Sequence, residues 1–278
     1  MLKRFPALLI ACLTAATFAA GSATQPTLPP SAKTAVDTLK NSPRHGEWVD
    51  IDLPGSTVKL HTFVVYPERP DKAPVVIVIH EIFGMSDWVR SVADRLAGEG
   101  FIAIAPDLLS GFGPNGGGTE AFAGDSMRSA FTKLTPDEQV KRLNAVRDYA
   151  LAQPSASRKS ATIGFCWGGG ASFNYATAQP DLNGAVVYYG SPPKKELQEK
   201  IKCPVLGMYG KSDNRITSTV DPTKTSMKSL GKIYDPHVFD GAGHGFLRQQ
   251  DEQNGANLKA TEQAWPLTIT FLKEQLEK

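Results

Sequence analysis

The chain has few cysteines, almost no net charge and no long apolar run beyond its N-terminus. Its 30 lysines and arginines balance 28 aspartates and glutamates, for a formal charge of +2, and no stretch gathers the basic residues. The chain therefore lacks the basic stripe that binds nucleic acid, and we expect no nucleic-acid partner. Beyond residue 23 no apolar run reaches the length of about 18 residues that spans a bilayer, so we expect no membrane span in the mature chain.

Only three cysteines are present, and Cys12 lies in the N-terminal segment, which leaves Cys166 and Cys203 in the mature chain. The predicted strands put Cys203 at the start of a strand two places from the strand that Cys166 ends. Strand spacing of about 4.8 Å and several residues of rise separate such Cα atoms by more than the bridging limit of about 7 Å. We expect no disulfide between them, and Cys203 is expected to be a core residue. Thiol redox chemistry is disfavoured because no resolving cysteine lies close in sequence.

The first 23 residues have the pattern of a secretory signal peptide. Lys3 and Arg4 precede an apolar stretch, and residues 21–23 are small, as a cleavage site requires. We therefore predict an exported protein, periplasmic or secreted. The residues ending at Cys12 also resemble a lipoprotein box, but the apolar stretch continues past Cys12, so lipid anchoring there is the less favoured alternative.

The rest of the chain is predicted to contain a flexible linker over residues 24–44 and one domain over residues 45–278. Strand and helix patterns alternate along that domain, which predicts an α/β fold with a mostly parallel central sheet and helices on both faces. With 41% hydrophobic residues the chain can bury one large core. The strands and helices expected by pattern are two strands over 46–66, a strand over 74–79, a helix over 86–100, a strand over 101–105, a capped helix from Thr135 to about 152 and a final helix over 257–277.

A strand, a sharp turn and a helix meet at residues 164–168 (Gly-Phe-Cys-Trp-Gly). A tight turn of this kind lifts the central side chain clear of the backbone, and the two flanking glycines let strand and helix approach it. Cys166 is therefore a candidate nucleophile. A buried cysteine is often only a small hydrophobe, so the prediction needs a base and a carboxylate as well.

Asp213 and His244 follow in the order that such an elbow requires. Asp213 ends an apolar strand, and His244 lies in a glycine-rich loop after a later strand. Alone, each residue fits an ordinary turn or loop. Together with Cys166 they lie at the carboxyl ends of predicted strands, where open α/β sheets place their ligand crevices. Asp240 is the alternative acid, but it is only four residues from His244 and is expected to serve the loop itself.

The strand over 74–79 ends in His80 and Glu81, at the place where such folds supply a second oxyanion donor. By position, the backbone N–H groups of Ile82 and Trp167 are the predicted oxyanion hole. A His-Glu pair also occurs in zinc-binding helices, but the second histidine is absent and the context is a strand end, so no metal is expected. Glutamate usually lies on the surface; here the apolar neighbours favour a buried position or a cleft.

Several stretches resemble the dienelactone hydrolase family, the carboxymethylenebutenolidases of the α/β-hydrolase fold, from about residue 60 to the C-terminus. They are residues 81–84 (Glu-Ile-Phe-Gly), 105–108 (Ala-Pro-Asp-Leu), 164–169 (Gly-Phe-Cys-Trp-Gly-Gly), 185–190 (Ala-Val-Val-Tyr-Tyr-Gly) and 242–244 (Ala-Gly-His) with Arg248. The resemblance implies a triad of Cys166, Asp213 and His244. It also implies that Glu81 contacts the thiol and helps to generate the thiolate when substrate enters.

Family members that cleave dienelactone hold the substrate carboxylate with two arginines. The resemblance places Arg248 at the first of these positions, whereas Gly111 lies at or near the second. The carboxylate clamp is thus incomplete, which puts dienelactone itself in doubt as a substrate. Phe83, Tyr189 and Phe246 are the other predicted substrate contacts, each with core packing as the alternative.

The expected activity is hydrolysis of small lactones or carboxylic esters through a thioester on Cys166, without a cofactor. The alternative is a non-catalytic binding or accessory protein on the same fold. The glycine-rich segment between residues 108 and 134 is either a flap over the cleft or a plain connector. The sequence does not predict the oligomeric state.

Overall fold

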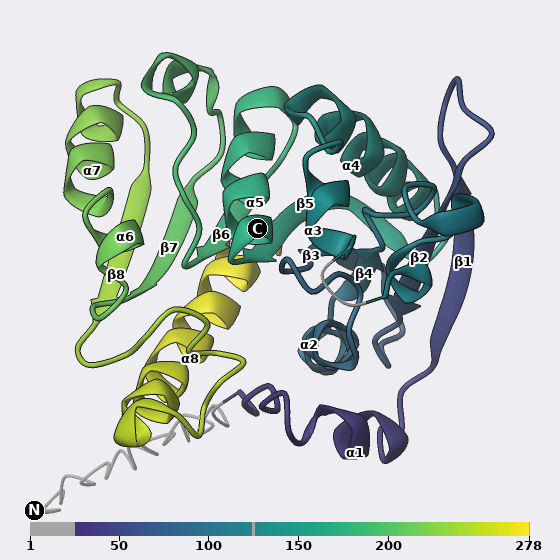
Figure 1. Cartoon of the computed structure of the whole chain (residues 1–278), viewed down its shortest axis with the longest axis horizontal. Helices are drawn as coiled ribbons and strands as arrows, with labels where there is room; N and C mark the ends of the chain where they lie inside the picture. The colour runs from purple at the N-terminus through teal and green to yellow at the C-terminus, as the bar shows by residue number, and fades with distance from the viewer. Residues whose placement is uncertain (1–25, 124–125, 278) are drawn as a thin grey trace, which may run out of the picture.

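The computed structural model describes residues 26–123 and 126–277, and its centre is a sheet of eight strands in the order β1-β2-β4-β3-β5-β6-β7-β8 (Figure 1). β1 and β2 pair antiparallel with each other and β2 with β4, while all the other neighbours are parallel. This arrangement confirms the predicted mostly parallel sheet. The strands are β1 Gly46–Asp52, β2 Lys59–Val65, β3 Ala73–Ile79, β4 Ile102–Pro106, β5 Ala156–Phe165, β6 Gly184–Tyr188, β7 Val205–Gly210 and β8 Tyr234–Phe239.

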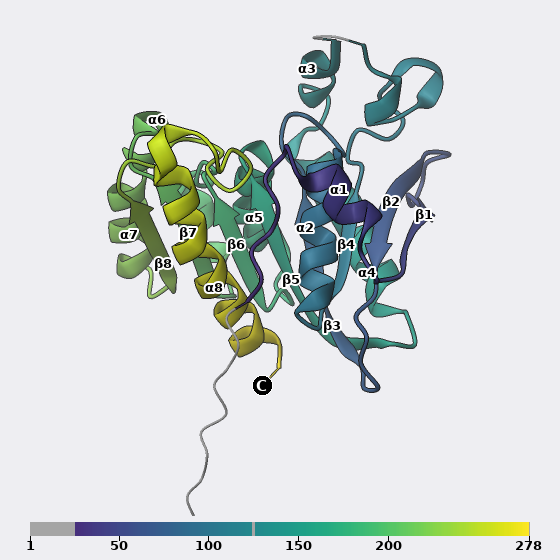
Figure 2. The same ribbon diagram turned by 90° about the horizontal axis from the view of Figure 1, so that it is seen from below.

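Helices cover both faces of the sheet, as the alternating pattern predicts. One core cluster joins the sheet to α4, α5 and α7, and a second joins it to α1, α2 and α8 on the opposite face (Figure 2). Because helices cover both faces of the sheet, every residue of the central strand β3 is buried. This explains why its sequence is a continuous apolar run and does not alternate with polar residues. The helices are α1 Ala35–Lys40, α2 Asp87–Gly98, α3 Ser126–Phe131, α4 Pro136–Leu151, α5 Trp167–Ala178, α6 Asn214–Thr217, α7 Val220–Ser229 and α8 Ala256–Leu276.

Local sequence signals fix the start of α4. The Thr135 side chain accepts a hydrogen bond from the backbone N–H of Glu138 at 3.3 Å, and Pro136 occupies the first helical position. The Thr135 oxygen gives a partner to a backbone N–H that has none within the helix. Proline, which has no N–H, is tolerated at the first helical position because the helix does not use the N–H there. The predicted helix start and its N-cap are therefore confirmed, but the reciprocal half of a capping box is absent, since the Thr135 N–H donates to the Lys133 carbonyl and Glu138 pairs with Arg142.

The N-terminal segment differs from its prediction as a flexible linker over residues 24–44. Its described part forms α1 and packs on the domain, where the Trp88 indole donates a hydrogen bond of 3.0 Å to the Pro30 carbonyl. The Arg44 guanidinium also forms an ion pair of 2.6 Å with the buried Asp94 carboxylate. Polar composition and prolines indicated a linker, but these long-range contacts satisfy the polar groups and order the segment.

The predicted signal peptide over residues 1–23 lies outside the described residues, as does the lipoprotein box at Cys12. Across residues 26–123 and 126–277, none of the helices combines the length and apolar character that crossing a bilayer requires. Cys166 and Cys203 are both free thiols in this part of the chain, and Cys203 is buried, in agreement with the expectation.

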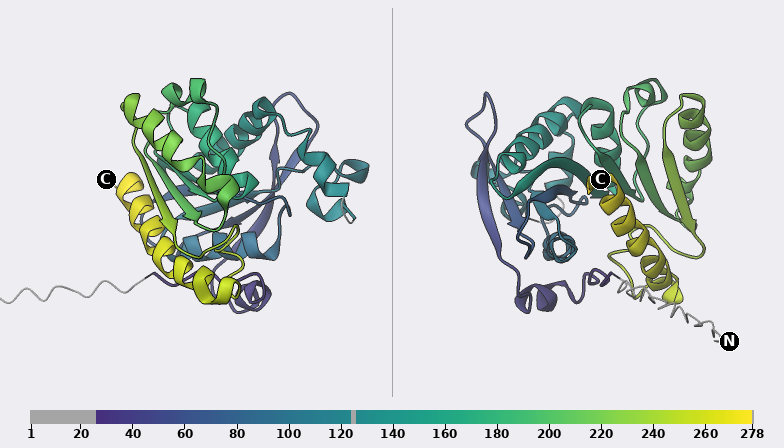
Figure 3. Two further views of the ribbon diagram at one scale, coloured as in Figure 1. Left: turned by 60° about the vertical axis from the view of Figure 1, so that its left-hand side comes forward. Right: turned by 180° about the vertical axis from the view of Figure 1, so that it is seen from behind.

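The described part of the glycine-rich segment after β4 forms short turns and α3. Asp107 holds it, since its carboxylate accepts hydrogen bonds from the Thr119 backbone N–H at 2.6 Å and from the Thr119 hydroxyl at 2.8 Å. The segment projects from the body of the sheet and carries α3 at its far side (Figure 3). Phe131 at the end of α3 packs edge-on against the Trp167 ring, with 4.8 Å between centroids, so the segment returns to the elbow.

Candidate active site

Cys166 lies in a strained turn between β5 and α5. Its φ of 56° and ψ of −116° fall where L residues are rarely found, so the surrounding structure must hold it there. A Cβ at Gly164 would come within 1.9 Å of the Gly168 carbonyl oxygen, and one at Gly168 within 2.3 Å of the His80 carbonyl oxygen. Both glycines are therefore required by close backbone approach, as the elbow motif predicts.

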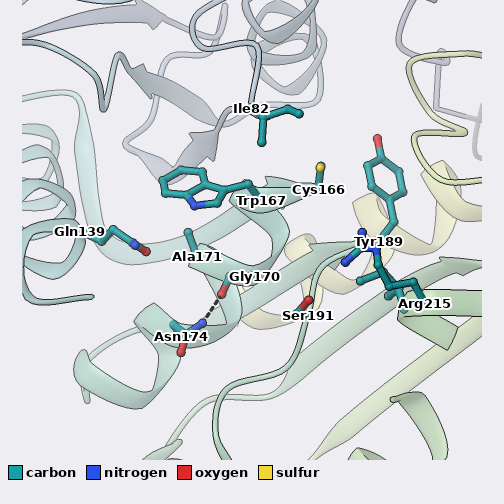
Figure 4. Close-up of a pocket in the computed structure, with 11 residues that line it drawn as sticks. Ile82, Gln139, Cys166, Trp167, Gly170, Ala171, Asn174, Tyr189, Ser191 and Arg215 are labelled. Atoms are coloured by element: carbon teal, nitrogen blue, oxygen red, sulfur yellow. Dashed lines mark hydrogen bonds between the residues drawn. The ribbon is translucent and has the colours of Figure 1, made fainter. Parts of the chain in front are cut away.

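The Cys166 side chain opens into a pocket of about 450 Å³ at the carboxyl ends of the parallel strands. Figure 4 shows the sulfur between Ile82, Trp167 and Tyr189 at one end of the pocket. The position fits the strand-end crevice that the sequence predicted. The lining residues are Ile82, Gln139, Cys166, Trp167, Gly170, Ala171, Asn174, Tyr189, Ser191, Arg215 and Ile216.

Asp213 and His244 form the predicted acid and imidazole pair. The His244 Nδ1 lies 2.5 Å from the Asp213 Oδ2, and the Asp213 side chain is nearly buried. A proton on Nδ1, donated to Asp213, leaves Nε2 free to act as a base. The alternative acid Asp240 is exposed and pairs with Lys211 Nζ at 2.8 Å, so it serves the loop as expected.

Tyr189 connects the imidazole to the cysteine pocket. Its ring centroid lies 5.1 Å from that of His244, and the same side chain lines the pocket beside Cys166. The Tyr189 hydroxyl is buried and has no hydrogen-bond partner among the residues that the structure describes. Burial raises the pKa of this phenol well above its ordinary value, so the hydroxyl stays protonated. Tyr189 therefore adds no negative charge beside the imidazole.

Opposing influences act on the Cys166 thiol. Burial, followed by the nearby Glu81 carboxylate, raises the pKa of the thiol above its usual range. The backbone N–H groups of Trp167 and Ile82 lower the pKa, as does the positive charge of Arg215, without overcoming the first two. Both predicted oxyanion donors therefore lie close enough to act on the sulfur. The resting group is a neutral thiol, and making the thiolate needs a base.

Glu81 is buried and forms a salt bridge with Arg248. Burial raises the pKa of Glu81 to about 7, against the opposing effect of Arg248. Arg248 Nε lies 2.7 Å from Glu81 Oε2, although the N–H bond does not point at that oxygen, so charge holds the pair. The guanidinium also covers the Phe83 ring at 4.7 Å. Glu81 is therefore in the buried position that its apolar neighbours favoured.

Only one of the residues predicted to contact the substrate lines the pocket. Tyr189 lines it, but Phe246 is wholly buried and packs on Tyr189 and Phe239, which corrects its prediction as a pocket wall. Phe83 is 51% exposed and Arg248 is engaged by Glu81, and neither lines the pocket. Each of these residues was inferred from its place in the sequence near a site residue, which does not fix the direction of a side chain.

Sequence reasoning missed Arg215, whose side chain lines the same pocket as Cys166. A signal was available, since Arg215 follows Asp213 by two residues in a loop at the carboxyl end of a strand. Gln139 and Asn174 were also missed, because they lie within helices and face the pocket only through tertiary packing.

The His80 side chain has a structural role, because both of its ring nitrogens form hydrogen bonds with the backbone. Its Nδ1 lies 2.8 Å from the Glu81 carbonyl oxygen, and its Nε2 accepts a hydrogen bond of 3.1 Å from the Leu108 backbone N–H. The ring thereby ties the turn after β3 to the end of β4 and has no nitrogen left for a ligand. In the described part of the chain no cluster of histidine, cysteine and carboxylate side chains suited to a metal ion is found.

The sheet order, the strained elbow and the acid and histidine on later strand ends together define an α/β-hydrolase. The chain belongs to the Dienelactone hydrolase family, whose sequence profile matches residues 60–276. It is 31% identical over 227 residues to the Escherichia coli (strain K12) protein named "Putative carboxymethylenebutenolidase", covering 75% of this chain and 81% of that relative.

Solved structures agree with this family. The structure titled "Putative Dienelactone Hydrolase" from Klebsiella pneumoniae is 25% identical, with a TM-score of 0.71, over 82% of this chain and 97% of that one. The dienelactone hydrolase-like phosphotriesterase P91 from metagenomic libraries, at 22% identity and a TM-score of 0.70 over 84% and 99% of the two chains, shares the fold. The protein is accordingly a hydrolase of carboxylic esters or lactones, with a small-molecule substrate.

Proposed function

We propose that the protein hydrolyses small lactones or carboxylic esters with Cys166 as the nucleophile, through a thioester intermediate. The observation that carries this proposal is the convergence of two backbone N–H groups on a sulfur that opens into a pocket. Donors placed there stabilise the negative oxygen that develops when the sulfur attacks a carbonyl carbon.

Glu81 is the group that accepts the thiol proton as substrate enters. Its carboxylate is near enough to raise the pKa of the Cys166 thiol. Its own pKa of about 7 allows both protonation states at neutral pH. A base works best when its pKa lies near the working pH. Burial of the thiol keeps it protonated until that transfer, which protects it between turnovers.

The bond changes follow from the positions of these groups. The Cys166 thiolate forms a bond to the carbonyl carbon, and the C–O bond to the leaving group breaks, which yields a thioester and an alkoxide or enolate. His244, oriented by Asp213, takes a proton from water through Nε2. Glu81 passes the proton that it took from the thiol to the departing alkoxide or enolate. The hydroxide adds to the thioester, the C–S bond breaks to release the carboxylic acid, and the His244 imidazolium returns its proton to the sulfur, which restores the thiol.

Alkylation of the thiol tests the proposal. Turnover of p-nitrophenyl acetate is measured before and after treatment with iodoacetamide, in the wild type and in Cys203→Ala. We expect alkylation to abolish turnover in both proteins, because Cys203 is buried in the core. Cys166→Ser is expected to lose at least about 10³-fold in kcat, since a hydroxyl lacks the nucleophilicity of a thiolate beside Glu81.

A covalent adduct distinguishes the thioester from simple binding. Rapid quenching followed by mass spectrometry is expected to show the acyl mass on the peptide that contains Cys166, and hydroxylamine is expected to remove it. Equal turnover by alkylated and untreated protein would instead favour the non-catalytic alternative.

We also propose that the protein is exported after removal of residues 1–23. The support is the cationic start, the apolar stretch and the small residues before the proline-containing segment. Mass spectrometry of the mature N-terminus from a periplasmic fraction tests this. A cytoplasmic, full-length chain contradicts it, and a lipid-modified N-terminal Cys12 identifies the anchored alternative.

A further inference from the structure

A second hollow adjoins the pocket of Cys166. Its volume is about 210 Å³, and it shares Gln139, Ala171 and Asn174 with the lining of that pocket. Figure 4 shows Gln139 and Asn174 at the end of the pocket that lies away from the sulfur. The second hollow therefore continues the pocket on the side remote from the nucleophile.

One face of α5 borders both hollows. Trp167 lies along the pocket of Cys166, and Ala178 lies along the second hollow. Between them, Ala171 and Asn174 border both. These positions are three or four residues apart and so share one side of the helix. A helix rises about 1.5 Å per residue, which gives a path of about 16 Å from Trp167 to Ala178.

Aliphatic side chains line the second hollow. Leu143 of α4 borders it and is fully buried. Val140, about one turn earlier in α4, and Leu197, in the 3-10 helix Lys195–Lys200, border it and are partly buried. α4 lies beside α5 (Figure 1), and the 3-10 helix also packs against α5. An aliphatic chain that enters the hollow is therefore removed from water by these helices, which favours its binding.

Beyond the pocket of Cys166 the lining has no net charge. The Gln139 and Asn174 amides are neutral, and each donates a hydrogen bond to a backbone carbonyl, at 2.7 and 2.8 Å respectively. The charged residues of the second hollow are Asp137 and Lys200, which are exposed and opposite in sign. The path along α5 therefore suits an uncharged chain.

The groups that move protons lie at the other end of the pocket. Neither His244 nor Glu81 lines either hollow. His244 lies against the Tyr189 ring, and the Glu81 charge, after burial, raises the pKa of the Tyr189 phenol, so both are near that ring. Figure 4 shows Tyr189 on the opposite side of the sulfur from Gln139. The leaving oxygen and the hydrolytic water, which exchange protons with these groups, thus belong at the Tyr189 end, and the Gln139 end is left for the acyl chain.

We propose that the path along α5 binds the acyl chain of the substrate, so that the preferred substrates are esters of unbranched, uncharged carboxylic acids. The inference rests on the proposed function and names its substrate class. An extended chain advances about 1.2 Å per bond, so an acyl chain of about eight to twelve carbons on Cys166 extends into the second hollow, whereas a butyryl chain ends in the first. The longer chain gains burial that the shorter one lacks.

The first test attaches chains to the thiol without requiring turnover. An alkyl methanethiosulfonate transfers its S-alkyl group to a thiolate and releases methanesulfinate, so the chain takes the place of the acyl chain in the thioester. The rates of the decyl and butyl reagents at Cys166, followed by mass spectrometry of its peptide, are each divided by the rate with glutathione. We expect the decyl reagent to be favoured about tenfold or more, because its longer chain enters the second hollow.

Tryptophan substitution fills the second hollow. Val140→Trp, and separately Leu197→Trp, is expected to lower the decyl preference about fivefold or more, because the chain loses its burial. Lys141→Trp is the matched control, since it adds the same side chain at the next position of α4, which borders neither hollow, and it should keep the wild-type preference. A wild type without a decyl preference overturns the inference, as does an equal preference in the wild type and both filled variants.

The second test measures turnover of p-nitrophenyl decanoate and p-nitrophenyl butyrate below their micelle-forming concentrations. The ratio of kcat/KM for the decanoate to that for the butyrate is expected to be about tenfold or more in the wild type and to fall about fivefold or more in Val140→Trp, mainly through KM. Lys141→Trp should keep the wild-type ratio. A ratio that is the same in the wild type and both filled variants overturns the inference.

Esters with the long chain in the alcohol distinguish the two ends of the pocket. The ratio of kcat/KM for decyl acetate to that for butyl acetate should not respond to Val140→Trp. A response in these esters, with none in the acyl series, places the alcohol in the path and overturns the inference. If the wild type hydrolyses none of these esters, the proposed function fails, and the thiosulfonate rates still decide whether the path binds a chain.

Discussion

The two halves of the active site are built by different means. The elbow around Cys166 and the turn after β3 are defined by backbone, since glycines allow peptide groups to approach within distances that a Cβ would forbid. The other half consists of side chains on separate loops that are held by polar pairs, such as Asp213 with His244 and Glu81 with Arg248. Changes in the first half should destroy geometry, whereas changes in the second should alter proton transfer within an intact fold.

The largest effect is expected from Gly168→Ala, which tests the backbone half. The new Cβ would meet the His80 and Ile79 carbonyl oxygens at 2.3 and 2.4 Å, so strand and helix must separate. We expect a loss of about 3 kcal/mol or more in the free energy of unfolding and no measurable turnover. Thermal unfolding followed by circular dichroism measures the first effect, and ester hydrolysis measures the second.

Gly170→Ala is the matched control in the same helix. Its Cβ would lie 3.4 Å from the Ser191 carbonyl oxygen, an ordinary contact, and alanine favours the helix by about 1 kcal/mol over glycine. The control should therefore be as stable as the wild type or more stable. If both variants unfold at the wild-type temperature, close backbone approach is not what the elbow requires.

Asp213→Asn tests the side-chain half and should be the next largest effect. The amide cannot hold the His244 tautomer that leaves Nε2 free, so deacylation should slow while the fold remains. We expect kcat to fall by about 10² to 10⁴ with little change in unfolding temperature. Asp240→Asn removes an exposed carboxylate of the neighbouring loop and should keep wild-type kcat. Similar losses in both variants would contradict the assignment of the acid.

A smaller, pH-dependent effect is expected from Glu81→Gln. Because burial raises the pKa of Glu81 to about 7, the folded protein binds this proton more tightly than the unfolded chain does. That contribution to stability is fully present below the ordinary pKa of a glutamate and is lost as the pH rises through about 7. Relative to Glu81→Gln, the wild type should therefore lose about 3 kcal/mol of stability between pH 4 and pH 8.

Urea unfolding of both proteins across this pH range measures the difference. Glu120→Gln, which changes a glutamate in the glycine-rich segment and keeps Glu81, is the control and should follow the wild-type curve. The rate of Cys166 alkylation should also lose its inflection near pH 7 in Glu81→Gln. Parallel stability curves for the wild type and Glu81→Gln would show that Glu81 titrates as an exposed carboxyl group does.

Much of the fold was predictable because its signals are local. The all-apolar run of β3 indicated a strand buried on both faces, and Thr135 with Pro136 fixed a helix start. The elbow was predictable for a similar reason, since the spacing of Gly164 and Gly168 around Cys166 reflects a short-range steric demand. Chain order then identified Asp213 and His244, and the structure places them in contact.

Other features depend on residues far apart in the sequence and could not be predicted. Residues 26–44 pack on the domain through contacts such as that of Pro30 with Trp88, which composition does not reveal. The burial of Phe246 follows from its packing on Tyr188, at the end of β6, and on Tyr189, which follows that strand.

The sequence by itself determined the alternating fold and the strained elbow, because each depends on residue types at short spacing, and its chain order named the candidate acid and histidine. Tertiary structure alone decided which cation faces the pocket. Arg248 pairs with a carboxylate 167 positions earlier in the chain, whereas Arg215, just after the end of β7, lines the pocket that contains Cys166. Charge pairing and side-chain direction are set by what folding brings together, so the residues that face a substrate emerge only in three dimensions.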